Sequence, residues 1–587
     1  MNRLAEFLQN IRSKTSGDFE AKDRFPTILF FFTIIFYVFH LLMTNPYLML
    51  EGEMWAEMAT NYFINAQSPS YFVKLFSTDA GYIPILPRLI ALVANLLNLK
   101  AATIPYFYNW TSATLTAIMV GTFCLSQFRA LVKSDALRFL VSISILVICD
   151  FETRTFINFT YFAAFFVAII TALSLVENSK EVPWWSWFIP ILILSKPAVL
   201  AALPMMLIVA IVSKPRFRLI AVISLVLCLV QILQIVVSNK NGQFVASNEL
   251  EILSKILALF EYFFGLLGKY LFGRFLNLDK FGGFLYLDKY VAILVGIVTT
   301  TIIAFLIKKK KYDSTMSLVI VGMSLLFFNV ALNSFALSDG WNLNMSKLDV
   351  NPPVHRHIIV GFFGCILIAC AMSVSASNCK IFKSIKFFKE NSAVKIFFIW
   401  LVATNWLLFG LRLSTQSSSP ILENSQWKNM SEAIDLDSSP LCVPIDPLGW
   451  LYSKNCNFLN PMPKNFSDKG EMLKIVNLST FKTKPSLNIS DKTLVSTAIL
   501  VRPLKPLANQ KTLIDAQMVI NLKNGNSKNY FGRKLLDSFG GLILLNGKEE
   551  ILIKDISSIE MNFSQPVELV KETVNQSEVF GIIWMGY

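Results

Sequence analysis

Two glutamates one residue apart follow the first long apolar run of the chain, in the segment Glu51-Gly52-Glu53. The spacing of apolar and polar residues from Glu53 onwards predicts a helix lying in the membrane interface. A carboxylate in such a position can take the proton of a substrate hydroxyl, and it is costly to keep there without a task. We therefore expect Glu51 or Glu53 to act as a general base, with Glu51 as the first choice. The alternative is that both are solvated surface acids.

Three basic residues lie at the predicted outer ends of apolar runs, where they would meet a phosphate group. Arg356 is the first choice, in the segment Pro352-Pro353-Val354-His355-Arg356-His357, because a guanidinium can grip a phosphate through two parallel hydrogen bonds. Lys196 lies at a turn between two apolar segments and is a weaker candidate of the same kind. Arg88 either meets the same phosphate or extends to the lipid headgroups, and the sequence does not decide between the two.

A second acidic cluster lies in the loop Asp150-Phe151-Glu152-Thr153-Arg154. Glu152 is positioned to orient a substrate that carries hydroxyl groups. The alternative is an ion pair of Asp150 or Glu152 with Arg154 inside the loop, although exposed pairs of this kind contribute little to stability. Both interpretations stay open at this point.

The composition excludes an ordinary soluble enzyme. Of the 587 residues, 54% are hydrophobic, 13% are aromatic and only 16% are charged, and the mean hydropathy is +0.53. An average soluble domain is about 25% charged, so much of this chain must be solvated by a lipid bilayer. The net charge of +14 would suggest nucleic acid in a soluble protein, but in a membrane protein the positions of Lys and Arg indicate topology instead. No nucleic-acid partner is therefore expected.

Apolar runs recur along residues 26–413 and predict a polytopic α-helical membrane domain with about eleven transmembrane helices. The first run is expected to be an uncleaved helix, because no small-residue cleavage site follows it. Two neighbouring runs could instead be one helix that is broken at Lys196-Pro197. The predicted spans are 26–43, 103–128, 137–149, 160–176, 184–195, 198–213, 219–238, 290–307, 316–336, 358–376 and 396–413.

The run 83–98 decides the orientation of everything after it, because it is short and contains two prolines and Arg88. If it does not span, the basic clusters up to Lys395 nearly all face the cytoplasm, as the positive-inside rule requires. We therefore expect 83–98 to be a juxtamembrane helix on the outer surface, within an outer loop of residues 45–102. The N-terminal segment 1–25 is then cytoplasmic and the C-terminus lies outside.

The composition changes at Ser414, where long apolar runs end and short alternating segments begin. This pattern predicts a β-rich domain of sandwich type over 414–587, which the topology places in the periplasm. Cys442 and Cys456 lie in this exported part, where an oxidising compartment permits a disulfide. The sequence lacks the motifs for ATP hydrolysis, zinc proteolysis and lipase-type catalysis.

The arrangement resembles the GT-C glycosyltransferase superfamily, which includes protein O-mannosyltransferases and the aminoarabinose transferases that act on lipid A. Those proteins carry an acidic pair in the loop after the first span. In those proteins an aromatic-Ala segment follows the acidic pair, and Trp55-Ala56-Glu57 can be aligned with it. Glu51 then occupies the position of the first acid, and Gly52 that of the second. The chain is more similar to uncharacterised bacterial members with an acidic-Gly motif and a later segment matched by Ala80-Gly81-Tyr82 and Leu86-Pro87-Arg88-Leu89.

The resemblance implies an inverting hexosyl- or pentosyltransferase of the bacterial inner membrane. It implies a polyprenyl-phosphate-linked sugar as donor, and a surface glycan, a lipid-linked oligosaccharide or lipid A as acceptor. Tyr82 would contact substrate, and Glu152 could bind a divalent cation, Mg²⁺ or Mn²⁺, together with Glu51. Whether a metal takes part is left open. The alternatives are a lipid-linked glycan polymerase and a transporter or flippase of a lipid-linked glycan.

Overall fold

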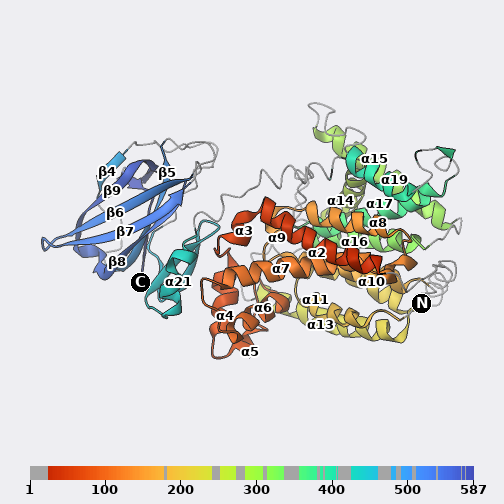
Figure 1. Cartoon of the computed structure of the whole chain (residues 1–587), viewed down its shortest axis with the longest axis horizontal. Helices are drawn as coiled ribbons and strands as arrows, with labels where there is room; N and C mark the ends of the chain where they lie inside the picture. Colours follow the sequence, from red (N-terminus) through yellow and green to blue (C-terminus); the bar gives the residue numbers. More distant parts are fainter. Residues whose placement is uncertain are drawn as a thin grey trace. The chain divides into compact units, whose positions relative to one another are not determined.

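The computed structural model divides into two compact units (Figure 1). The helical unit comprises Met1–Asn45, Pro69–Ile90 and Asn109–Ser417, and the β unit comprises Pro46–Ser68, Ala91–Tyr108 and Ser418–Tyr587. Most of the predicted cytoplasmic segment 1–25 and the predicted domain boundary at 413/414 lie outside the described residues. The structure describes residues 24–176, 181–240, 252–272, 285–308, 314–335, 356–379, 384, 385, 387, 391–404, 406, 425–460, 478–483, 491–504, 511–536, 540–569, 571–574 and 577–587.

Five helices of the helical unit, within the described part of the chain, are long and apolar enough to cross a membrane. This confirms a helical membrane-type region, with fewer long helices than the eleven predicted spans. The five helices are α2 (Phe25–Thr44), α13 (Pro215–Lys240), α15 (Leu285–Lys308), α16 (Met316–Ser334) and α17 (Ile359–Ser377).

The remaining predicted spans form helices that are shorter, interrupted or less apolar. The interruption is clearest at Lys196, whose backbone is extended because the proline at 197 disfavours helical geometry in the residue before it. The run 83–98 forms a helix of twelve residues, which is shorter than the roughly 20 residues that a span needs. The helix of the run 83–98 is α6 (Ile85–Leu96), and the helices of the remaining predicted spans are α7 (Ile104–Gly121), α8 (Asp135–Val147), α10 (Ala163–Ser174), α11 (Ile189–Ile193), α12 (Leu203–Ala210) and α19 (Ser392–Ala403).

Glycines set the closest helix contacts of the helical unit. Helix α14 (Ile252–Phe272) packs along α15, and α16 packs along α17. A Cβ atom built on Gly364 of α17 would lie 2.3 Å from the carbonyl oxygen of Gly322 in α16, and one built on Gly268 of α14 would lie 2.0 Å from that of Ala292 in α15. Small residues at such crossings allow two helix backbones to approach closely in a membrane.

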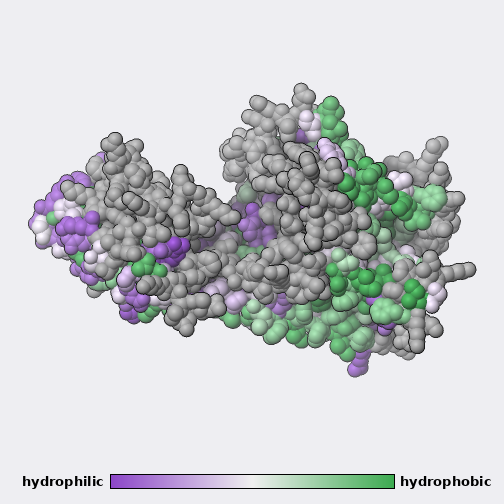
Figure 2. Space-filling model, turned by 90° about the horizontal axis from the view of Figure 1, so that it is seen from above, coloured by the Kyte–Doolittle hydropathy of each residue, from purple (hydrophilic) through white to green (hydrophobic). Residues whose placement is uncertain are grey.

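Apolar side chains also lie on the outside of the helical unit, and Figure 2 shows hydrophobic patches on the face in view. On α13 the exposed apolar residues recur every three or four positions and so share one face of the helix. A face of this kind is suited to lipid rather than to water. Its members are Leu219, Val222, Val226, Leu229 and Leu233.

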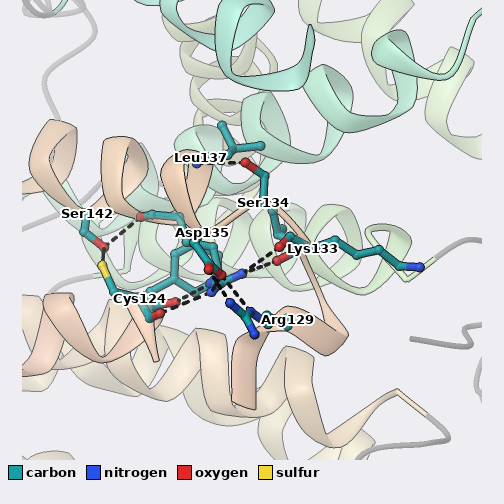
Figure 3. A network of polar contacts seen from close by, with 10 residues as sticks. Cys124, Arg129, Lys133, Ser134, Asp135, Leu137 and Ser142 are labelled. Atoms are coloured by element: carbon teal, nitrogen blue, oxygen red, sulfur yellow. Dashed lines mark hydrogen bonds and ion pairs between the residues drawn. The ribbon is translucent and has the colours of Figure 1, made fainter. Parts of the chain in front are cut away.

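A network of polar contacts connects the residues before α8 with its first turns, and Figure 3 labels Cys124, Arg129 and Asp135 among its members. Arg138 is fully buried, and its guanidinium donates to the backbone carbonyls of Phe123 at 3.0 Å and Cys124 at 3.2 Å, to those of Val132 and Lys133, and to the Asp135 carboxylate. Asp135 also pairs with Arg129. These contacts use all five N–H donors of the Arg138 guanidinium, so this arginine has a structural role.

The β unit is built on one eight-stranded sheet with the order β3-β12-β5-β8-β7-β6-β9-β4. Alternate residues of the strands point into an apolar core, as Ile514, Met518 and Ile520 do from β6. The strands are β3 (Asn457–Phe458), β4 (Leu478–Thr483), β5 (Thr493–Pro503), β6 (Thr512–Leu522), β7 (Ser527–Leu536), β8 (Gly541–Leu552), β9 (Ile556–Leu569) and β12 (Ile582–Gly586).

The sheet closes on itself, because the end of β5 pairs with β9 over Val501–Pro503 while β8 pairs along its other edge. Strands β5, β8, β7, β6 and β9 therefore form a ring. The β-rich domain is confirmed, but it is a closed barrel and not the predicted sandwich of two sheets. Long strands with register shifts, such as those in β5 and β9, can bend enough to close in this way.

The segment after the first helix packs within the β unit. A parallel bridge joins Trp55 to Asp446, and the backbone N–H of Ala56 donates to the Asp446 carbonyl at 2.5 Å. The chain then forms a π-helix over Met58–Phe63. A helix therefore forms over part of the predicted segment, but Met54, Met58 and Tyr62 are buried here, so its apolar face packs against protein and not against the membrane interface as predicted.

A small hairpin completes this unit. Strands β1 (Leu441–Ile445) and β2 (Trp450–Lys454) pair next to helix α21 (Trp427–Asp435). The predicted disulfide is confirmed, because Cys442 and Cys456 are bonded with their Cα atoms 5.5 Å apart. The rings of Phe63, Trp427 and Tyr452 pack edge to face with one another.

The glycine crossing of α16 and α17 gives a first prediction. The substitution Gly364→Ala should lower the midpoint of thermal unfolding of the detergent-solubilised protein, because the new side chain would overlap the Gly322 carbonyl. The matched control for Gly364→Ala is Gly121→Ala, because a Cβ atom at 121 would lie closest to the end of the Thr33 side chain, at 3.3 Å, which can shift by a few tenths of an ångström. Equal midpoints for the two variants would contradict a close crossing at Gly364.

Candidate functional site

A cavity of about 610 Å³ lies inside the helical unit, between α13, α16 and the segment from the 3₁₀-helix η6 (Pro197–Ala202) to α12. Its walls are apolar. The cavity is not enclosed, and several wall residues from α13, α16 and the residue after α16 are partly exposed. These are Ile232, Val236, Leu332 and Phe335.

A few polar side chains interrupt the apolar lining of the cavity. Tyr82 and Tyr161 line it, together with Asn329, Asn333 and His357. An apolar cavity with a few convergent polar groups is the usual form of a small-molecule site. The ligand that suits this cavity is therefore a long apolar molecule with one polar end.

Lys196 lies directly behind Tyr82. It is only 5% exposed, and its ammonium group donates to the Tyr82 hydroxyl at 2.8 Å, to Asn158 Oδ1 at 2.9 Å and to the Ile157 carbonyl at 3.3 Å. The same nitrogen lies 5.0 Å from the ring centre of Tyr82 and 5.1 Å from that of Tyr161. A hydroxyl that accepts from a cation becomes a stronger donor. Lys196 thus places positive charge at the polar part of the cavity and orients Tyr82.

Arg356 and Glu152 form an ion pair with 2.9 Å between Nη1 and Oε2, and both side chains are partly exposed. Arg356 is adjacent to His357, which lines the cavity. The charges of Arg356, Glu152 and Asp150 all act on the Tyr161 hydroxyl. The pair therefore lies close to the polar lining.

The alternative pairing inside the loop 150–154 is not formed by Glu152. Arg154 is buried instead, and donates to Asn45 Oδ1 at 2.8 Å and to the Val147 carbonyl at 2.9 Å. Asp150 caps helix α9 (Phe151–Arg154) by accepting from the backbone N–H of Thr153 at 2.9 Å. Glu152 is thus left to pair with Arg356.

A tight turn presents Tyr82 to the cavity. The backbones of Asp79 and Tyr82 exchange two hydrogen bonds, of 2.8 and 3.1 Å, and the two residues between them have positive φ, +45° at Ala80 and +80° at Gly81. Positive φ at both central positions is the mark of a type I′ turn, which glycine favours. The sequence Ala80-Gly81-Tyr82 is therefore a turn motif.

Arg88 supports this turn. Its side chain is buried and donates to the Thr78 carbonyl at 3.3 Å. This buried position argues against a side chain that extends to the lipid headgroups, and contact of Arg88 with a phosphate stays a prediction. Arg88 holds the backbone just before the turn because a buried guanidinium needs hydrogen-bond acceptors within the protein.

Other polar residues of the site were missed by the sequence analysis. Gln231 of α13 is fully buried and bonds both backbone groups of Ile83, accepting at 3.0 Å and donating at 3.3 Å. Asn329 and Asn333 of α16 both donate to the His357 carbonyl, and Asn329 also accepts from the Gly361 N–H at 3.1 Å. Single polar residues within long apolar runs are the sequence signal that would have revealed them.

The two loop glutamates belong to the β unit and have different environments. Glu53 is buried, and its carboxylate accepts from the backbone N–H groups of Trp427 at 2.9 Å and Lys428 at 3.4 Å, in the first turn of α21. Burial raises its pKa to about 7, although the Lys534 charge and these hydrogen bonds oppose the rise. Glu53 thus caps a helix.

Glu51 is 41% exposed and lies 3.3 Å from the Lys511 ammonium. Gly52 separates the two acids with φ +72°, and a Cβ atom there would lie 2.7 Å from the Tyr106 ring. A second acid at position 52 would be strained, because side chains rarely adopt this φ and the Tyr106 ring would have to move. Of the two glutamates, the exposed Glu51 is the one that a substrate can reach.

A divalent cation has no evident ligand set here. Glu51 belongs to the β unit, and Glu152 of the helical unit pairs with Arg356. Within the described residues, no group of three or more His, Cys, Asp or Glu side chains could hold a metal ion. The described residues therefore do not supply a ligand set for the expected Mg²⁺ or Mn²⁺.

The buried Glu53 gives a prediction for pH dependence. The unfolded chain ionises this group near 4.5 and the folded protein near 7, so stability should fall as pH rises from about 4.5 to 7, by on the order of 3 kcal/mol. Glu53→Gln, which keeps an oxygen acceptor for α21, should reduce this fall in a thermal unfolding series. Glu53→Ala loses the acceptor and should lower the unfolding midpoint at every pH. An unchanged pH profile in Glu53→Gln would contradict a buried, titrating carboxylate.

Comparisons of the chain with protein-family models, with curated proteins and with solved structures give no match. The structure brings Tyr82 and Lys196 together in one hydrogen bond and Glu152 and Arg356 in one ion pair. What the cavity can bind therefore follows from its own residues and geometry.

Proposed function

We propose that the protein is a membrane glycosyltransferase of GT-C type that moves a sugar from a polyprenyl-phosphate donor to a glycan or glycolipid acceptor. The observation that carries the proposal is the apolar cavity of the helical unit with cations at its polar lining. The proposed setting is the outer face of a bacterial inner membrane, with about eleven spans, a cytoplasmic N-terminus and a periplasmic β unit.

The apolar walls suit the first part of a polyprenyl chain. They are built from aliphatic and aromatic side chains of α12, α13 and α16. Some of the partly exposed wall residues belong to α13, which also carries an apolar outer face. A lipid could enter at these residues while the rest of its chain stays in the bilayer, so that its apolar surface never crosses water.

The polar lining suits the phosphate of the donor. A phosphate that leaves an anomeric carbon gains negative charge, and fixed donors and cations stabilise such charge in a water-poor site. Lys196 supplies a buried positive charge, and Tyr82 supplies a hydroxyl oriented by it. Arg356 supplies a partly exposed guanidinium already held by Glu152, which a phosphate can share or displace.

The proposed reaction is a single displacement. The acceptor hydroxyl oxygen forms a bond to the anomeric carbon while the bond from that carbon to the phosphate oxygen breaks, and the electron pair leaves with the polyprenyl phosphate. The acceptor proton passes to a carboxylate base, for which Glu51 is the proposed residue. One displacement inverts the anomeric configuration. The transferred hexosyl or pentosyl group then lies on a surface glycan, a lipid-linked oligosaccharide or lipid A.

Donor binding is testable with purified protein. Undecaprenyl phosphate should raise the thermal unfolding midpoint more than undecaprenol does, because only the phosphate engages the cations. Arg356→Gln should reduce the affinity for the phosphate about tenfold, an energy of about 1.4 kcal/mol, and leave the response to undecaprenol unchanged. Ala331→Trp, in the cavity wall, should reduce both responses.

Ala210→Trp is the control for Ala331→Trp, because Ala210 is partly buried on α12 but does not line the cavity. Equal responses of the native protein to the phosphate and the alcohol would argue against a phosphate site. Equal losses in the two Trp variants would argue against this cavity as the lipid site.

The reaction itself is testable in cells. Mass spectrometry of lipid-linked and surface glycans should show a defined sugar that is lost in a deletion strain, restored by the native protein and not restored by an equally abundant Glu51→Gln variant. Full rescue by Glu51→Gln would remove Glu51 as the base. Accumulation of an unpolymerised repeat unit would favour the polymerase alternative. Unchanged glycans in the deletion strain would favour a transporter or flippase of a lipid-linked glycan.

A further inference from the structure

The outer face of the barrel carries a hollow of about 680 Å³ over three neighbouring strands, β7, β6 and β9. The strand register sets two rows of side chains across it. Gln517 lies between Phe531 and Asn562 in one row. In the next row Asp515 lies opposite Arg533, and its backbone N–H donates to Ser564 Oγ at 2.9 Å. The hollow is thus lined by the exposed ring of Phe531 and five polar side chains, together with Ala516, Gly532 and the buried Phe563.

Phe531 and the polar residues face outwards because their strand neighbours fill the core. Ile514, Ala516 and Met518 of β6 are buried, so the residues between them point away from the barrel interior. Gly532 lets β7 lie close to β8, because a Cβ atom there would be 2.2 Å from the Leu544 carbonyl oxygen. Phe531, the neighbour of Gly532 in the strand, points to the opposite face and is 59% exposed.

We propose that this hollow is a binding site for a neutral saccharide. A pyranose ring has an apolar face of C–H groups and a rim of hydroxyls. The flat face of the Phe531 ring can pack on the apolar C–H face of the sugar and exclude water from it. The sugar hydroxyls need both hydrogen-bond donors and acceptors. These are offered by the amides of Gln517 and Asn562 and by the Asp515–Arg533 pair.

The charges and the strand pairing favour this ligand over others. The Arg533 guanidinium is paired with the Asp515 carboxylate, with 3.2 Å between Nη2 and Oδ2 for one contact of the pair, so the cation and the anion of the hollow balance. A phosphate or an anionic polymer would need excess positive charge. Strands β7, β6 and β9 each have a neighbour on both sides, and a peptide strand has no free edge there to join.

The inference does not depend on the proposed transferase reaction, because it concerns binding on the barrel alone. It adds a class of ligand to the β unit: a glycan held by its sugar rings. If the transferase proposal also holds, such a site would retain the acceptor glycan on the protein between encounters.

The test measures saccharide binding to the full-length protein in nanodiscs, so that no glucoside or maltoside detergent competes. The probes are maltohexaose, cellohexaose, α-mannohexaose and the delipidated surface polysaccharide of cells that produce the protein, followed by saturation-transfer NMR and titration. The native protein should bind at least one probe. Phe531→Ala should weaken that binding at least about tenfold, and Phe531→Trp should retain it.

Leu535→Ala is the matched control, because Leu535 lies on the same face of β7, is 49% exposed and does not line the hollow. It should change the affinity less than about twofold. Binding of none of the four probes by the native protein, or equal effects of Phe531→Ala and Leu535→Ala, would overturn the inference. Neither outcome bears on the transferase proposal, which the Glu51→Gln glycan comparison tests separately.

Discussion

The helical unit depends on one requirement: a polar group that is removed from water must find its partners inside the protein. Lys196 shows this most clearly, because its ammonium group is bonded to Tyr82, Asn158 and the Ile157 carbonyl. These partners come from two segments far apart in sequence. Lys196 therefore holds the segment of Tyr82 and the segment of Ile157 and Asn158 together. The polar groups that satisfy its buried ammonium group include Tyr82, which lines the cavity.

The same requirement explains the other buried polar residues around the cavity. Gln231 bonds both backbone groups of Ile83, directly after the turn that carries Tyr82. Asn329 and Asn333 hold the His357 carbonyl before α17. Each removes an unsatisfied backbone group from an apolar surrounding. Together they give a cavity of apolar walls a rigid polar lining, which is the property that the proposed lipid-phosphate donor requires.

In the β unit the same requirement separates two acids that are neighbours in sequence. Glu53 is buried and satisfied by the first turn of α21, and its raised pKa, about 7, follows from that burial. Glu51 remains partly exposed beside Lys511. Environment therefore assigns different tasks to similar residues, as it does for paired carboxylates in many enzymes. Glu53 secures the loop to the helix, and Glu51 is the more exposed of the two carboxylates.

The sequence by itself determined the class of the protein and its main elements. Low charge and long apolar runs indicated a membrane region, and the helices α2, α13, α15, α16 and α17 follow those runs. Alternation after Ser414 predicted the β-rich domain, and Cys442 and Cys456 form the expected disulfide. These predictions succeed because hydrophobic periodicity and composition are local properties of a chain.

Tertiary structure alone decided the barrel closure, the burial of Glu53, the support of the Tyr82 turn by Arg88 and the pairing of Arg356 with Glu152. Arg356 and Glu152 are 204 residues apart in the sequence, and no local pattern encodes such a pairing. It arises when packing removes water from the surroundings of a charged or polar group and leaves a particular distant residue as its partner.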